Sequence, residues 1–191
     1  MFVKPPGPRH AVTEEADGLA IRIPAKRNLF IVGFLSLWLC VWAVAEVLAS
    51  IAFFTAAEMV PGASAFLLFW LCGWTVGGAF AIFIWLWQVK GCEVVTVSPT
   101  ALSIRREVLG YGVTKNYDVA EVRGLRIAPL TFNPFDFRSG LAFWGIGGGM
   151  LAFDYGFKTY RFGGGVDEAE VRIIHQTIIS RLPPVSSATS A

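Results

Sequence analysis

The sequence predicts an integral membrane protein of the α+β class, in which an antiparallel two-helix transmembrane hairpin is followed by a small antiparallel β domain. Two apolar runs, residues 29–54 and 65–87, each exceed the roughly 20 residues that cross a hydrocarbon core of about 30 Å as a helix. From Glu93 onward, short β-rich runs alternate with turn residues. An apolar stripe at helical spacing then predicts a C-terminal amphipathic helix that caps the β domain.

The composition restricts the classes of partner. Hydrophobic residues make up 54% of the 191 residues, and charged residues 16%, against about 25% in an average soluble domain. The deficit of charge is local, because Glu46 and Glu58 are the only Asp, Glu, Lys, Arg or His residues between positions 29 and 87. The net charge of +2 is too small to favour a nucleic-acid partner.

The residues before the first apolar run divide into a tail and a strand. Residues 1–18 contain several prolines and no apolar core, so we expect a disordered tail and no cleavable signal peptide. The first span would then act as its own insertion signal. Residues 19–28 alternate apolar and polar side chains up to Ile23 and end in a basic flank, which predicts a strand that joins the later sheet.

The basic residues around the hairpin, residues 29–88, predict its orientation. The connection of residues 55–64 has no Lys or Arg, whereas basic residues flank the other end of each span, so both chain termini are expected in the cytoplasm. A connection this short makes the helices antiparallel neighbours. The expected interface anchors are Lys26, Arg27, Trp85, Trp87 and Lys90.

Small residues in the second span predict close helix packing. Gly73 and Gly77 form a G-x-x-x-G step that Gly78 extends, and small residues let helix backbones approach within lipid. Two interpretations stay open: packing between the two helices of one chain, or a seam between copies of the chain.

Glu46 is the polar residue of the spans that needs an explanation. A carboxylate near a helix centre costs about 3 kcal/mol on insertion scales. Three interpretations stay open: a neutral carboxyl hydrogen-bonded to Thr75 or to a tryptophan of the second span, a charged group at the outer interface, or a proton or cation site.

Residues 93–182 predict a cytoplasmic β domain. Strands are expected at residues 93–97, 101–107, 113–118 and 122–128, the last with a bulge at Gly124. Residues 150–155 and 157–162 flank Gly156 as a hairpin. A helix over residues 167–182 begins at a capping-box-like Asp167 and Glu170, and residues 183–191 are expected to be a disordered tail. The apolar stripe of the helix consists of Val171, Ile174, Ile178 and Leu182.

The order of these elements carries a family resemblance. The strand–Ser98-Pro99-Thr100–strand unit, Ile104-Arg105-Arg106 and the run of residues 122–127 resemble bacterial membrane proteins with a pleckstrin-homology-like (PH-like) domain preceded by a two-helix hairpin. The resemblance implies a small PH-like β-barrel or sandwich closed by the helix. It also implies a multi-pass protein of the bacterial cytoplasmic membrane.

Residues 129–149 are an insertion that is long for a loop between strands. It is too apolar for a freely solvated loop, so either it folds over the barrel, with an extra strand at residues 141–144, or it enters the headgroup layer. The residues of this membrane-contact loop are Phe132, Phe135, Phe137, Phe143 and Trp144.

No residue set predicts catalysis. His10 and His175 are the only histidines, no set has metal-ligand spacing, and Asp154 is expected to pair with Lys158 or Arg161. We therefore expect a non-enzymatic interaction or scaffold module, without cofactor or metal, whose partners are the lipid bilayer and a protein or a second copy. The alternatives are a small oligomeric channel or transporter subunit that uses Glu46, and a lipid-binding protein that uses the loop of residues 129–149.

Overall fold

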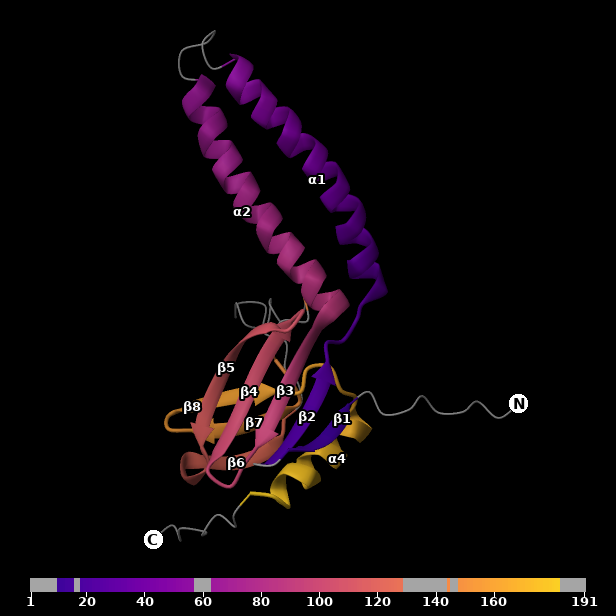
Figure 1. Cartoon of the computed structure of the whole chain (residues 1–191), viewed down its shortest axis with the longest axis vertical. Helices are drawn as coiled ribbons and strands as arrows, with labels where there is room; N and C mark the ends of the chain where they lie inside the picture. The colour runs from indigo at the N-terminus through magenta and orange to yellow at the C-terminus, as the bar shows by residue number, and fades with distance from the viewer. Residues whose placement is uncertain (1–9, 16–17, 57–62, 129–143, 145–147, 183–191) are drawn as a thin grey trace, which may run out of the picture. The chain divides into compact units, whose positions relative to one another are not determined.

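The computed structural model describes residues 10–15, 18–56, 63–128, 144 and 148–182. It divides the chain into two compact units. One consists of Met1–Lys26 together with Lys90–Ala191, and the other of Arg27–Val89; below they are called the β unit and the helical unit. Long apolar helices and antiparallel sheets make this an α+β protein, as the sequence predicts (Figure 1).

The helical unit consists of α1 (Leu29–Ala56) and α2 (Ala63–Lys90), which have 28 residues each. The helix α1 begins where Asn28 caps it, because the Asn28 side chain accepts hydrogen bonds from the backbone N–H groups of Phe30 and Ile31. Both helices are apolar on all sides and long enough to cross a membrane. Each helix is slightly longer than the expected span.

The larger sheet of the β unit is antiparallel, in the order β1-β2-β3-β4-β5 (Figure 1). Its alternate side chains are buried, and Ile21, Val95 and Leu102 are completely enclosed. The strands are β1 (Ala11–Glu15), β2 (Gly18–Pro24), β3 (Gly91–Val97), β4 (Ala101–Val108) and β5 (Tyr111–Asp118). Every strand expected in these ranges is present, and β1 is an additional strand within the expected N-terminal tail.

The helical unit is inserted between two neighbouring strands. Pro24 at the end of β2 pairs with Cys92 in β3, and the N–H of Ala25 donates to the carbonyl of Gly91 over 2.9 Å. The chain therefore leaves the sheet and returns to it at adjacent positions. The two helices occupy the place in the sequence where a β-hairpin would have its turn.

The smaller sheet has the order β6-β7-β8 and is also antiparallel. It contains β6 (Val122–Ile127), β7 (Leu151–Tyr155) and β8 (Lys158–Phe162). The register between β6 and β7 shifts between Arg123 and Arg126, and Gly124 has a φ of 60°, so the expected bulge is present.

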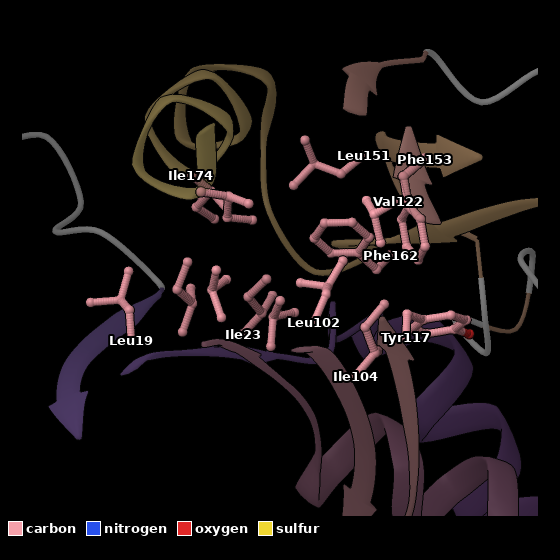
Figure 2. Close-up of a cluster of buried hydrophobic side chains, with 14 of the residues drawn as sticks. Leu19, Ile23, Leu102, Ile104, Tyr117, Val122, Leu151, Phe153, Phe162 and Ile174 are labelled. Atoms are coloured by element: carbon pink, nitrogen blue, oxygen red, sulfur yellow. The ribbon is translucent and has the colours of Figure 1, made fainter. Parts of the chain in front are cut away.

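The helix α4 (Glu168–Ile179) follows the sheets and buries three of the four residues of the predicted stripe. It ends before the expected residue 182, so Leu182 lies beyond it and is partly buried. The Asp167 side chain accepts a hydrogen bond from the N–H of Glu170 over 2.9 Å, which caps the helix as expected. Val171, Ile174 and Ile178 are at most 1% exposed. They join side chains of both sheets in one core, in which Ile174 faces Leu19, Leu102 and Phe162 (Figure 2).

The expectation of a closed barrel is wrong for the part of the chain that the structure describes. The strands form two separate hydrogen-bonded sheets, and no backbone ladder joins β5 to β6. The ladder ends here because residues 119–121 form a 3-10 turn, in which the Asp118 side chain accepts from the N–H of Ala120. The β unit is two packed sheets with α4 against their common core.

Candidate functional site

Polar groups of α1 form hydrogen bonds with groups of α2 at several positions along the two helices. Asn28 N donates to Gln88 Oε1 over 3.1 Å, and Trp85 Nε1 donates to Ser36 Oγ over 2.8 Å. Trp42 Nε1 donates to the Trp74 carbonyl over 3.3 Å. Positions that rise along α1 meet positions that fall along α2, so the helices are antiparallel neighbours.

Glu46 lies at the interface between α1 and α2 and contacts Thr75, as one of its three interpretations proposes. Thr75 Oγ1 is 2.5 Å from Glu46 Oε1 and 2.7 Å from the carbonyl of Leu71. A hydroxyl has one hydrogen, so it cannot donate fully to both oxygens. Glu46 Oε2 is buried and has no hydrogen-bond partner among the described residues.

Tryptophan rings pack along and between α1 and α2. Trp38 and Trp42 are stacked with ring centroids 6.5 Å apart, and Trp70 and Trp74 are stacked at 5.3 Å. Trp38 also contacts Trp74, at 6.3 Å. These distances are typical of ring packing between helices.

The three glycines of α2 do not share one role. A Cβ at Gly78 would overlap the indole ring of Trp42, so this glycine allows α1 and α2 to approach. A Cβ at Gly73 or Gly77 would have no described atom within 4 Å. Packing within one chain therefore accounts for Gly78 alone, and the G-x-x-x-G step faces open space.

The expected interface anchors have different surroundings. Lys26 and Lys90 are exposed, whereas Arg27 donates to the carbonyl of Val89 over 2.8 Å. Trp87 is 5% exposed. The indole N–H of Trp85 is already paired with Ser36, a partner that the sequence pattern did not indicate.

Most of the expected membrane-contact loop lies outside the described residues. Phe132, Phe135, Phe137 and Phe143 belong to that part, as do the tails expected at residues 1–9 and 183–191. Trp144 is described and is half-buried. The interpretation of this loop stays a prediction.

Asp154 of β7 pairs with a residue that the sequence analysis did not select. Arg126 donates to its two carboxylate oxygens over 2.6 Å and 3.1 Å, and the Thr159 hydroxyl donates over 2.6 Å. The expected partners, Lys158 and Arg161, were wrong because the bulge in β6 brings Arg126 diagonally opposite Asp154. The hydrogen bond from Arg126, followed by that from Thr159, lowers the pKa of Asp154.

Other reactive side chains of the β unit have structural surroundings. His175 Nε2 is 3.1 Å from the carbonyl of Leu125, which joins α4 to β6. Burial raises the pKa of the Cys92 thiol, and its hydrogen bond to Glu107 raises it further, so the reactive thiolate is disfavoured. Within the described ranges, no three His, Cys, Asp or Glu side chains could hold a metal ion together.

Comparison of the chain with protein-family models, with curated proteins and with solved structures found no match.

Proposed function

We propose that this protein is a membrane-anchored PH-like interaction module of the bacterial cytoplasmic membrane. The helical unit crosses the bilayer as a hairpin, and the β unit stands on the cytoplasmic face as a non-enzymatic scaffold. Its partner is another protein or a second copy of the chain. Anchoring raises the local concentration of the module without any new contact.

The observation that carries the proposal is the exposed apolar surface of α1 and α2. Phe30, Phe54 and Phe69 are each about 80% exposed, although helices of a water-soluble protein bury such side chains. Leaving a side chain of this size in water forgoes about 1.5–3 kcal/mol of burial free energy. Lipid removes this cost, and both helices have the length that a bilayer requires.

The position of the insertion supports the proposed topology. The chain leaves β2 and enters β3 at paired residues, so both ends of the inserted segment belong on one side of any bilayer that the helices cross. Basic residues at these ends, Lys26, Arg27 and Lys90, favour the cytoplasmic side. The PH-like assignment is supported by two antiparallel sheets that share a core with the C-terminal helix α4.

Two measurements on bacterial membranes test the anchor and its orientation. Alkaline carbonate is expected to leave the chain in the membrane pellet. A reporter active only in the cytoplasm should work when fused after Leu182 and fail when inserted between residues 56 and 63. Release of the chain by carbonate, or the opposite reporter pattern, contradicts the proposal.

The scaffold role has its own test. Crosslinking in native membranes followed by mass spectrometry is expected to link surface lysines of the β unit to a specific protein or to a second copy. Crosslinks confined to single chains, at the native expression level, contradict the scaffold role while leaving the anchor intact.

The unpartnered oxygen of Glu46 favours a second candidate function, a small channel or transporter subunit. An intramembrane carboxyl with a free acceptor can take up a proton or a cation. This candidate predicts that Glu46→Gln abolishes proton or ion flux into proteoliposomes that contain the wild-type chain. If the flux is equal for wild type, variant and empty vesicles, the channel or transporter function is excluded.

A further inference from the structure

A cavity of about 340 Å³ lies in the β unit beside the edge strand β5. Side chains of β4, β5 and β8 surround it, so it opens where the two sheets are not joined by a backbone ladder. Its lining residues are Ile104, Arg106, Val113, Lys115, Tyr117, Tyr160 and Arg161.

The lining combines positive charge with aromatic and aliphatic surface. Three of its seven side chains are cationic, two are phenols and two are aliphatic, and none is acidic. Lys115 is exposed, and no acidic side chain among the described residues pairs with its ammonium group. This ammonium group is therefore available to a ligand.

Arg106 is held in a fixed position at the cavity. Its Nε is 3.0 Å from Glu93 Oε1, and its Nη2 donates to the carbonyl of Arg161 over 3.1 Å. Glu93 is buried and compensates the charge of Arg106. The charge that a ligand would meet in the cavity then comes from Lys115 and from Arg161, whose guanidinium donates to the neutral carbonyls of Ala128 and Gly149.

The tyrosines supply hydrogen-bond donors. Tyr117 is 6% exposed, and its hydroxyl oxygen points away from the other labelled core side chains (Figure 2). Its ring centroid is 4.9 Å from that of Tyr160. Burial raises the pKa of Tyr117, and the nearby Tyr160 and Tyr155 add to this against the lowering effect of Arg106. The phenol stays protonated at neutral pH and can donate.

We propose that this cavity binds an anionic group, a phosphate or a carboxylate, carried on a small apolar body. The ammonium group of Lys115 pairs with the anion, and the hydroxyls of Tyr117 and Tyr160 donate to its oxygens. Ile104 and Val113 contact the apolar body. The proposal goes beyond the function above and does not depend on membrane insertion, because all the lining residues belong to the β unit.

Phenyl phosphate is a soluble probe with both features of the proposed ligand. Its binding to the full-length chain, held in phosphatidylcholine nanodiscs, can be measured by isothermal titration calorimetry, with inorganic phosphate as the probe that lacks the apolar body. We expect phenyl phosphate to bind, with a Kd of about 1 mM or lower, and inorganic phosphate to bind more weakly.

Matched variants locate the binding. Lys115→Glu is expected to weaken phenyl phosphate at least about tenfold, whereas Lys158→Glu makes the same charge change at an exposed lysine outside the cavity and should leave the Kd within about twofold. Tyr160→Phe keeps the ring and removes the donor, so a loss of about fivefold is expected. Both lysines are exposed, and unchanged melting curves establish that the variants fold.

The remaining outcomes identify the source of the anion or overturn the proposal. If the wild type no longer binds phenyl phosphate in phosphatidylglycerol nanodiscs, the lipid headgroup occupies the cavity. Unchanged binding in these nanodiscs identifies a free anion. Absence of phenyl phosphate binding up to about 10 mM, or equal losses in Lys115→Glu and Lys158→Glu, overturns the proposed site.

Discussion

The pKa of Asp154 depends mainly on Arg126, a residue that the sequence analysis did not predict as its partner. The carboxylate accepts hydrogen bonds from Arg126 and Thr159, and these hold its pKa below the ordinary value of 3.8. A folded-state pKa below the unfolded value gives stability that is present above about pH 4 and is lost as the pH falls through the folded pKa.

The substitution Asp154→Asn tests this assignment. We expect a lower melting temperature than wild type at pH 7, and a difference that shrinks steadily as the pH falls below about 4. Circular dichroism melts at several pH values measure it. Glu168→Gln alters an exposed ion pair with Arg172 and serves as the control. A difference for Asp154→Asn that does not depend on pH contradicts the assignment.

The hydroxyl of Thr75 provides a residue-scale test of the seam in the helical unit. Thr75→Val removes the contact with Glu46, and we expect a loss of about 1 kcal/mol, as for hydrogen bonds between helices in lipid. Thr55→Val is the matched control, because among the described residues the Thr55 hydroxyl donates to Ile51 of its own helix alone. Thermal melts in detergent, followed by near-ultraviolet circular dichroism of the tryptophans, compare the two. Equal losses would show that Glu46 gains nothing from Thr75.

At the scale of elements, α2 has two faces with different packing. Gly78→Ala places a methyl group against the Trp42 indole, and overpacking of this kind costs about 1–3 kcal/mol. Gly77→Ala enters open space on the same helix and should not lower the melting temperature in detergent. If both variants melt like wild type, Gly78 does not set the distance between the helices.

The open face of α2 gives a separate prediction about copies of the chain. If Gly73 and Gly77 form a seam between copies, Gly77→Leu should reduce the crosslinked dimer in native membranes, because a large side chain keeps helix backbones apart. Gly33→Leu is the control, since Gly33 lies in α1 and also has open space around it. Equal dimer yields in wild type and Gly77→Leu would exclude a contact between copies at Gly73 and Gly77.

The existence of the elements could be predicted because each depends on local pattern. Apolar runs predicted α1 and α2, and the Asp167 cap with a stripe at helical spacing predicted α4. Gly124 predicted the bulge in β6. The start of α1 at Leu29 was also predicted, but other ends were not: α2 continues to Lys90, and α4 ends at Ile179, before the expected residue 182.

At the scale of the whole β unit, one carboxylate joins the two sheets. Glu93 of β3 binds Arg106 of β4 through one oxygen and accepts from the N–H of Gly163, just after β8, through the other, over 2.6 Å. The Glu93 side chain is buried, and its contact with Gly163 is shielded from water, whereas the Arg106 side chain stays 37% exposed. This carboxylate makes a connection that a continuous backbone ladder makes in a closed barrel.

Glu93→Gln removes the charge from this connection. It leaves the guanidinium of Arg106 without its acidic partner, but this side chain is 37% exposed and water can solvate it, so we expect the free energy of unfolding to fall by about 1–2 kcal/mol. Urea denaturation followed by far-ultraviolet circular dichroism measures the change, and Glu121→Gln at an exposed position is the control. A loss no larger than that of the control would show that the sheets hold together without Glu93.

The sequence by itself determined the class of the protein and the order of its elements, because hydrophobic length and periodicity act locally along the chain. For Glu46 it offered three interpretations, and the structure contains the contact with Thr75 that one of them proposes. Only the tertiary structure decided that the sheets stay separate, that Arg126 binds Asp154, and that Lys115 lies beside two tyrosines in a cavity. These features depend on contacts between residues far apart in sequence, and such contacts follow from strand register and packing, which no local pattern specifies.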